Sequence, residues 1–311
     1  MSRNEKQQAS HHPVKVGDAI NLSLELAERE QNSALGIPSG FPCLDRLTRG
    51  WKAGELVVLG GRPCSGKTAI ALRMARNAAV DFGVPTVYLS HGLTVTEITD
   101  RLIVSESGIP MEKLRGEKKM QAEDWQQMES SLKRLSDAPL YLEDTPAGMS
   151  GEYRLGEFKA IADELIHGHG VRLVFVDDLQ TTIPDWVGFD GDCFARENRK
   201  NLHFLKEMAK DYEVTIVVLT NVERPKMRKY SGPGMMDLES YCPCAEDYAD
   251  KIILLHRPRL IDFDNDGGKE GAEPLSVALV KNKNGRTGIL ELPFDSNRIL
   301  VMNPDDKWSN V

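Results

Sequence analysis

Residues 56–82, LVVLGGRPCSGKTAIALRMARNAAVDF, constrain the fold of this chain more than any other stretch. The segment starts with an apolar run, Leu56 to Leu59, that is long enough for a buried strand, and it ends in a segment with helical periodicity. Between the two, Gly61 to Thr68 fits the pattern G-x-x-x-x-G-K-[ST] at every fixed position. A strand, a glycine-bearing turn and a helix in this order predict a phosphate-binding P-loop.

Phosphate binding accounts for the residue types in this turn. Glycines let backbone amides approach phosphate oxygens closely, and a helix starting near Gly66 directs its positive end at the same anion. Lys67 is expected to reach the β- and γ-phosphates, and Thr68 to place its hydroxyl on Mg²⁺. A simple turn before an amphipathic helix, with Lys67 exposed, is the alternative, and four fixed residues in the right context argue against it. The residues predicted to bind the nucleotide are Gly61, Arg62, Pro63, Cys64, Ser65, Gly66, Lys67 and Thr68.

The composition indicates a globular chain that does not cross a membrane. Of its 311 residues 41% are hydrophobic, yet no apolar run approaches the roughly 20 residues of a membrane helix. The polar N-terminus lacks the apolar stretch of a signal peptide. The five cysteines are scattered and odd in number, which favours a reducing compartment. We therefore expect a soluble, cytoplasmic protein.

Two further features of the composition bear on ligands. Cys242 and Cys244 form C-P-C, but no second Cys or His pair stands at zinc-ligand spacing, so a structural role is expected rather than a metal site. The formal net charge of −8 argues against electrostatic coating of nucleic acid over the whole surface, although it permits a local basic loop.

The chain is expected to have three parts: a tail and helix at 1–35, an α/β domain at 36–304 and a short tail at 305–311. Residues 1–14 are polar without periodicity and are predicted to be disordered. Val16 to about Asn32 is predicted to be a helix, and its isolation suggests that it packs on something other than the core of its own domain. The glycines and proline of 36–40 end it.

Strand-like and helix-like segments alternate through the α/β domain. This alternation predicts a mainly parallel sheet with helices on both faces, and the last strands, which have no helices between them, predict an antiparallel edge. Thr94 and Glu97 have the spacing of a helix capping box. The predicted strands are 56–59, 85–90, 140–142, 172–178, 215–221, 251–256, 275–281 and 288–292. The predicted helices are 66–82, 94–107, 122–135, 152–167 and 196–212, with a loop at 183–195 and a polar turn at 262–271.

The strand at 172–178 ends in two carboxylates, Asp177 and Asp178. An apolar strand ending in Asp downstream of a P-loop is the Walker B arrangement, in which Asp177 holds Mg²⁺ through water beside the P-loop. An ordinary strand-terminal Asp is the alternative. In many P-loop ATPases the carboxylate directly after this Asp activates the attacking water, and Asp178 stands there with one methylene fewer than the usual Glu.

Several motifs together resemble the C-terminal ATPase domain of DnaB-type replicative helicases, from about Val16 to Asn303. The family's G-I-P-T-G-F-x-x-L-D opening, its A-R-P-S-M-G-K-T loop, its I-D-Y-L-Q strand end, its D-L-R-E-S-G and E-Q-D-A-D stretches and its K-Q-R-N-G-P-T-G element all have similar counterparts. These counterparts are GIPSGF with LD (36–45), GRPCSGKT (61–68), VDDLQ (176–180), DL (237–238), EDYAD (246–250) and KNKNG with TG (281–288).

The resemblance implies a RecA-like fold, Mg²⁺ and ATP as cofactors, and translocation on single-stranded DNA as a hexameric ring. It identifies the helix at 16–32 with the family's linker helix, which docks on the neighbouring subunit. In such a ring Lys281 and Lys283 would reach the γ-phosphate held by the adjacent subunit. The alternative assembly is a mixed ring with a replicative helicase.

The departures from the family concern hydrolysis more than phosphate binding. The glutamate that positions the attacking water is replaced by Gly92, the glutamine that senses the γ-phosphate by Asn221, and the arginine finger by Lys283, which lacks the planar fork of arginine. An arginine near the expected DNA-facing loop is replaced by Glu239. Loss of a positioned base lowers the rate by about 10²–10⁴ and loss of an arginine finger by about 10³–10⁵. Asp178 and Lys283 are the residues expected to restore part of it.

Three functions compete. The first is a DnaB-like ATP-dependent helicase or translocase, and the second is a helicase-derived accessory or loading factor that binds ATP and hydrolyses it slowly or not at all. A RecA-like recombination or clock-type ATPase is the third, and the linker helix and KNKNG element argue against it. A basic loop favours DNA contact, with Tyr230 available to stack on a base, but a solvated loop explains it equally well. Its four cations are Arg224, Lys226, Arg228 and Lys229.

Overall fold

The computed structural model divides the chain into two compact units, Met1–Leu35 and Gly36–Val311. In the first unit, residues 16, 17, 19, 20 and 24 are helical. The predicted disordered tail at 1–14, the turn at 262–271 and the tail at 305–311 lie outside the described residues. The structure describes residues 15–17, 19–20, 24, 36–144, 151–179, 191–222, 232–239, 242, 244–258, 272–283 and 285–304, without the side chains of 151–158, 191–197 and 239.

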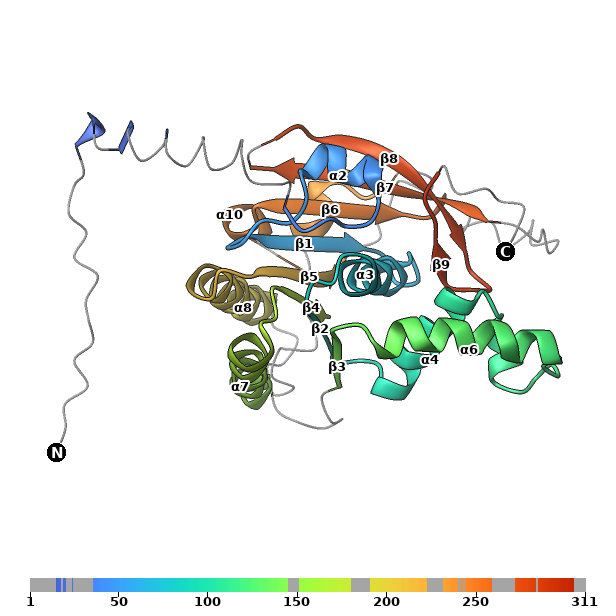
Figure 1. Cartoon of the computed structure of the whole chain (residues 1–311). Coiled ribbons are helices and arrows are strands. Elements are labelled where there is room, and N and C mark those ends of the chain that lie inside the picture. The colour runs from blue at the N-terminus through green and yellow to red at the C-terminus, as the bar shows by residue number, and fades with distance from the viewer. Residues whose placement is uncertain are drawn as a thin grey trace. The chain divides into compact units, whose positions relative to one another are not determined.

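A single mixed sheet runs through the second unit, in the strand order β3-β2-β4-β5-β1-β6-β7-β8-β9 (Figure 1). The six strands from β3 to β6 are parallel to their neighbours, whereas β7, β8 and β9 pair antiparallel. This arrangement confirms the predicted parallel sheet with an antiparallel edge. The strands are β1 (Leu56–Gly61), β2 (Thr86–Ser90), β3 (Leu140–Asp144), β4 (Leu173–Asp177), β5 (Thr215–Asn221), β6 (Lys251–His256), β7 (Glu273–Asn282), β8 (Gly288–Asp295) and β9 (Leu300–Val301).

Helices cover both faces of this sheet, as predicted. One buried cluster joins the sheet to α2, α3 and α4, and a second joins its other face to α7, α8 and the short α9 and α10. The helices are α2 (Pro42–Thr48), α3 (Lys67–Arg76) with a π-helical turn η1 (Asn77–Asp81), α4 (Val95–Ser107), α5 (Met111–Leu114), α6 (Ala122–Ser136), α7 (Gly151–His169), α8 (Gly191–Asp211), α9 (Met235–Glu239) and α10 (Ala245–Tyr248). No described helix is both long enough and apolar enough to span a bilayer.

The two clusters explain why the central strands are apolar without interruption. In β1, Val57 and Leu59 belong to the cluster under α3, whereas Leu56 and Val58 belong to the cluster under α8. Successive side chains of a strand point to opposite faces, so a parallel strand covered on both sides needs apolar residues at every position. The same reasoning accounts for β4 and β5.

Local signals set several helix ends. The predicted capping box is confirmed: the Glu97 amide donates to Thr94 Oγ1 (3.3 Å), and the Thr94 amide donates to the Glu97 carboxylate (2.9 Å). One boundary was wrong, because α8 begins at Gly191 and takes in the last residues of the predicted 183–195 loop. Asp192 follows Gly191 directly, and an acidic residue in the first turn favours a helix N-terminus.

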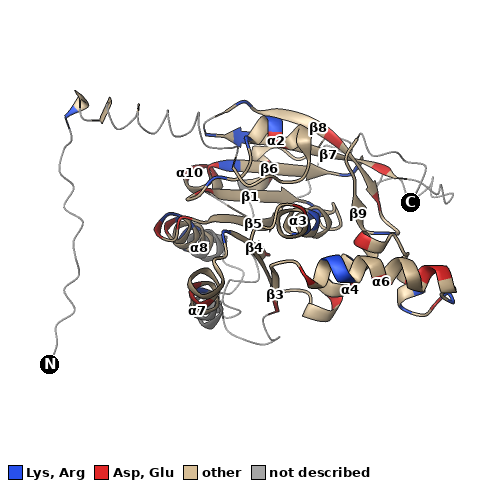
Figure 2. Ribbon diagram, in the orientation of Figure 1, with Lys and Arg blue, Asp and Glu red and all other residues tan. Residues whose placement is uncertain are grey.

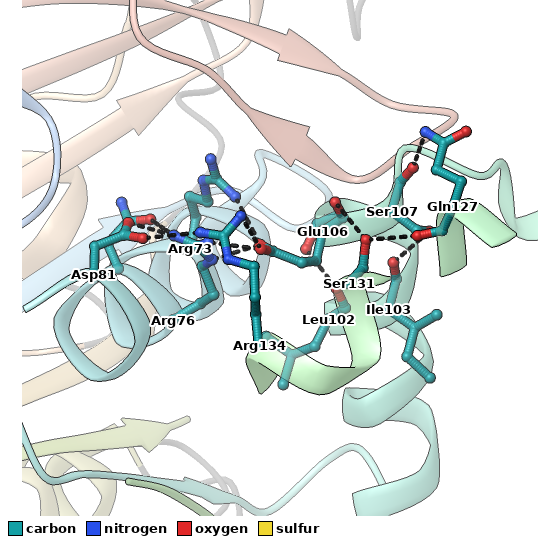
Figure 3. Close-up of polar contacts among 12 residues, drawn as sticks. Arg73, Arg76, Asp81, Leu102, Ile103, Glu106, Ser107, Gln127, Ser131 and Arg134 are labelled. Atoms are coloured by element: carbon teal, nitrogen blue, oxygen red, sulfur yellow. Dashed lines mark hydrogen bonds and ion pairs between the residues drawn. The ribbon is translucent and has the colours of Figure 1, made fainter. Parts of the chain in front are cut away.

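A buried charge network fixes the far end of α3 (Figure 3). The Arg76 guanidinium donates to both oxygens of Glu106 on α4, at 2.5 and 2.7 Å, and also pairs with Asp81. Arg134 on α6 lies 3.2 Å from the same Glu106 carboxylate. The Arg76 and Glu106 side chains are each only 4% exposed. The network therefore ties the helix that follows the P-loop to α4 and α6.

Candidate nucleotide-binding site

The P-loop is a tight turn between β1 and α3. A Cβ atom added at Gly61 would lie 2.4 Å from Ser65 Oγ, so a larger residue there would displace the Ser65 hydroxyl. Gly66 has φ +91 and caps α3 without a side-chain hydrogen bond, which leaves the first amides of the helix available to an anion. Ser65 Oγ is buried and has no hydrogen-bond partner among the described residues. This cradle fits a phosphate group, whose oxygens would accept hydrogen bonds from these donors.

Lys67 lies folded over the loop. Its Nζ donates to the carbonyl oxygens of Gly61 (2.9 Å) and Arg62 (3.1 Å) and to Asn221 Oδ1 (2.9 Å). Burial lowers the pKa of Lys67, while the carboxylates of Asp177 and Asp178 act in the opposite direction. The ammonium group is thus held at the carboxyl ends of β1 and β5, where strand ends of an α/β sheet commonly bind ligands.

Thr68 and Asp177 meet beside this lysine. The Thr68 hydroxyl donates to Asp177 Oδ2 at 2.8 Å, so the first turn of α3 contacts the end of β4. A hydroxyl and a carboxylate are ligands that suit Mg²⁺, which usually takes one or two protein oxygens together with phosphate oxygens and water. Among the described residues no three or more His, Cys, Asp or Glu side chains gather as a metal site. The pair therefore fits a nucleotide-associated cation.

Asp178 is linked to the P-loop lysine by hydrogen bonds through Asn221. Asn221 Nδ2 donates to Asp178 Oδ2 at 3.4 Å while Asn221 Oδ1 accepts from Lys67, so the three side chains form a chain of contacts. The parallel register of β1 and β5 sets Asn221 beside Gly61. Asn221, which the sequence resemblance predicts to replace the family glutamine, is thus in direct contact with the P-loop lysine.

Gly92, which the sequence resemblance predicts to replace the family glutamate, lies just beyond β2 and is exposed. A Cβ built there meets no atom within 4 Å, so no described side chain fills the position. Glu97 is held in the capping box with Thr94. The His91 amide donates to the Asp177 carbonyl oxygen at 2.7 Å, which fixes this segment against the end of β4.

Lys281 and Lys283 do not join this site. The antiparallel pairing of β6 and β7 sets Lys281 opposite Ile252, near the start of β6, whereas the P-loop end of β1 pairs with Leu255 near its finish. Lys281 Nζ donates to the Ala249 carbonyl oxygen at 2.7 Å. Lys283 Nζ lies 3.7 Å from Asp250 Oδ1, and its side chain is 64% exposed. Both lysines therefore lie at the end of the strands opposite the end that carries the P-loop.

The predicted DNA-contacting residues fall outside the described residues: Arg224, Lys226, Arg228, Lys229 and, as a stacking residue, Tyr230. Over the described elements, Lys and Arg are mixed with Asp and Glu rather than gathered on one side (Figure 2).

Cys242 is buried, and burial raises the pKa of its thiol to about 12. Cys244 Sγ accepts a hydrogen bond from Arg199 at 2.8 Å.

Two further residues of the site region were not predicted from the sequence. Tyr88, in the middle of β2, donates its hydroxyl to Asp177 Oδ2 at 2.7 Å, and burial followed by the Asp177 charge raises the pKa of this phenol, which keeps it a donor. His256 ends β6, and its Nε2 is buried without a hydrogen-bond partner among the described residues. Burial and then the Arg62 charge lower the pKa of His256. Both residues lie within apolar segments that were predicted as strands, and no local pattern in the sequence indicates a role in the site.

The fold and this loop define a P-loop protein of the RecA-like class. A family model described as the DnaB-like helicase C-terminal domain matches residues 36–302. Replicative DNA helicase DnaB of Leifsonia xyli subsp. xyli is 30% identical over 285 residues, which cover 90% of this chain and 59% of that protein. The chain belongs to the family of DnaB-like helicase C-terminal domains, and it spans about three fifths of the length of that relative.

Solved structures agree with this assignment. The ATPase domain of G40P superposes with a TM-score of 0.74 at 25% identity, covering 94% of this chain and 99% of that one. The structure of a DnaB-like replicative helicase, described together with its interactions with primase, gives a TM-score of 0.76 at 26% identity and covers 94% of this chain and 67% of that one. These likenesses confirm the predicted RecA-like fold.

Proposed function

We propose that this chain is a Mg-ATP-binding subunit of a DnaB-like ring that translocates on single-stranded DNA, with hydrolysis slower than in the replicative helicases. The convergence of Lys67, Thr68 and Asp177 at the carboxyl ends of β1 and β4 carries the proposal. Membership of the helicase family supports the assignment of the nucleotide as ATP. The DNA contact rests on this membership and on the basic loop at 224–230.

In the proposed site each residue has a separate task. Lys67 exchanges its carbonyl acceptors for phosphate oxygens, and the amides at the start of α3 receive the same anion. Thr68 and Asp177 hold Mg²⁺, which neutralises charge on the phosphates when it is bound. Asn221 senses whether a nucleotide phosphate is bound, because it contacts both Lys67 and Asp178.

The ring is supported by two features of the described residues. Lys281 and Lys283 lie at the end of the strands opposite their own P-loop, so the nucleotide they would contact belongs to another subunit. In the N-terminal unit, Val16, Ile20 and Leu24 are four residues apart on helical positions and are 74%, 52% and 59% exposed. Such an apolar stripe on one face of a helix is suited to packing on a neighbouring subunit. The neighbour is a second copy of this chain or, in a mixed ring, a replicative helicase.

Slow hydrolysis follows from the vacant position at Gly92. With no carboxylate there, we assign the role of base to Asp178, which directly follows β4 and whose Oδ2 accepts a hydrogen bond from Asn221. The same observation favours a second candidate function: a hydrolysis-deficient, ATP-binding accessory or loading factor in DNA replication. The two functions share the nucleotide site and differ in turnover.

One experiment separates them: steady-state ATPase activity with and without single-stranded DNA, measured beside Mg-ATP affinity on the same preparation. Slow turnover that rises with DNA supports the translocase. Retained ATP affinity without turnover in either condition supports the accessory factor. Absence of ATP binding by the wild-type chain contradicts both, and Lys67→Ala provides the baseline for each measurement.

A further inference from the structure

Tyr88 is a polar residue in the most buried layer of the domain. It lies in the middle of β2 and is 0% exposed, and its ring stacks on Phe175 of β4 with ring centroids 5.8 Å apart. The register of the two strands pairs Tyr88 with Phe175 and Ser90 with Asp177. Because side chains alternate along a strand, Phe175 and Asp177 share one face, and the Tyr88 ring extends along that face toward the strand end.

Three elements meet at one carboxylate oxygen. The Tyr88 hydroxyl of β2 and the Thr68 hydroxyl of α3 donate to the same Asp177 Oδ2, at 2.7 and 2.8 Å. Both of these hydrogen bonds go to Oδ2 rather than to Oδ1. Two donors on one oxygen fix the rotation of the carboxylate and direct its other oxygen away from both of them. A carboxylate with Thr68 as its single donor would be freer to rotate about the Cβ–Cγ bond.

Packing alone does not call for this hydroxyl. Phenylalanine would fill the same space against Phe175, whereas a buried phenol without an acceptor costs about 1–3 kcal/mol. The phenol is a neutral donor, so it orients the Asp177 charge without cancelling it, as a lysine or arginine would. The hydroxyl is therefore explained by what it does to Asp177 rather than by core volume.

We propose that Tyr88 is a positioning residue for divalent-cation binding, which holds the Asp177 carboxylate in the orientation that receives a hydrated Mg²⁺ beside a bound nucleotide. The inference rests on the proposed nucleotide site and adds to it a residue that does not touch the nucleotide. Partners of metal-binding carboxylates commonly change metal affinity by about 10–100-fold.

The test compares Tyr88→Phe with wild type by two measurements. Mn²⁺ affinity is determined by electron paramagnetic resonance with protein in excess over ADP, and the affinity for a fluorescent ADP analogue is determined in EDTA. We expect Tyr88→Phe to weaken Mn²⁺ binding about 10-fold or more and to leave metal-free ADP affinity unchanged. Circular dichroism checks that the variant is folded.

Tyr141→Phe is the matched control. Tyr141 lies on neighbouring β3, but it packs against the cluster on the other face of the sheet and contacts His169 (4.9 Å between ring centroids). This variant should bind Mn²⁺ as wild type does. In an Asp177→Asn background, Tyr88→Phe should change Mn²⁺ affinity no further, because the carboxylate it orients is gone.

Wild-type Mn²⁺ affinity in Tyr88→Phe would overturn the inference while leaving the proposed function intact. An equal loss of ADP affinity in EDTA would also overturn it, since the hydroxyl would then serve the structure of the whole site. If wild type itself binds neither ADP nor Mn²⁺ with ADP, the proposed function fails and this inference fails with it.

Discussion

Glu106→Gln should destabilise the domain far more than its conservative chemistry suggests. The substitution keeps the size of the side chain and removes one charge from the network at the end of α3 (Figure 3). Arg76, which donates to both Glu106 oxygens, then remains buried with one carboxylate partner, Asp81. The side chain of Asp81 is 38% exposed, so it compensates only in part.

The burial of the pair sets the size of the effect. Breaking a buried ion pair by removing one partner costs about 3–5 kcal/mol, because the other charge stays desolvated. Asp81 remains beside Arg76, and Arg134 is 58% exposed and can turn to solvent, so we expect about 3 kcal/mol. For a domain of this size each kcal/mol lowers Tm by about 2–4 °C, which predicts a decrease of about 6–12 °C.

The assay is thermal and urea unfolding followed by circular dichroism, with Glu112→Gln as the matched control. Glu112 pairs with Lys118 on the surface, where the two side chains are 49% and 69% exposed, and such pairs contribute about 0–1 kcal/mol. If both Glu→Gln variants lose the same stability, burial does not decide the strength of these pairs and the reasoning is refuted.

Three further predictions concern nucleotide binding, assembly and pH. Lys67→Ala should weaken Mg-ATP affinity about 10- to 100-fold by calorimetry, because it removes charge-assisted contacts worth about 1.5–3 kcal/mol; equal affinities would contradict the site. Deletion of residues 1–35 should leave a monomer by light scattering, and an unchanged mass would count against the linker helix. Burial raises the pKa of Asp250, but hydrogen bonds from Lys206 and the Leu56 amide outweigh it and the folded pKa is lowered. The ionised Asp250 carboxylate therefore stabilises the folded state above its ordinary pKa of 3.8, and this stabilisation is lost as pH falls through the lower pKa of the folded state. The difference in stability between wild type and Asp250→Asn should accordingly shrink below about pH 4.

The parts of the fold that depend on local pattern could be predicted from the sequence. Uninterrupted apolar runs such as 56–59 and 173–176 identify strands covered on both faces, and Thr94 with Glu97 marks the start of α4. The short elements could not be predicted in this way. The two-residue β9 and the four- or five-residue helices α5, α9 and α10 contain too few residues for a periodicity. Tertiary contacts decide whether they form.

The candidate site also combines residues that local sequence patterns identify with residues whose contacts depend on tertiary packing. The spacing of Gly61, Lys67 and Thr68 identifies the phosphate loop because consecutive residues build it. Tyr88 and Asp177 are far apart in the chain, and their contact depends on the register of β2 and β4. The same holds for Arg76 and Glu106, whose pairing depends on how α3 packs on α4. Sequence patterns report the burial of such residues, and their partners emerge only from the packed structure.

The final prediction concerns Gly92. A Cβ at this position meets no atom within 4 Å, and the backbone there does not adopt a positive φ, so a side chain can be added there without a clash at its Cβ and without backbone strain. Gly92→Glu should then raise ATP turnover, by up to about 10²-fold if the new carboxylate acts as a positioned base.

Asp178→Asn tests the other half of this reasoning. It should abolish the residual activity of wild type but spare much of the activity of Gly92→Glu, because the new carboxylate then replaces Asp178 as the base. Gly92→Ala is the matched control, since it adds the Cβ without the carboxylate, and its turnover should equal that of wild type. Wild-type turnover that survives Asp178→Asn would show that Asp178 is not the base. A Gly92→Glu variant no faster than Gly92→Ala would show that the missing carboxylate at position 92 does not limit hydrolysis.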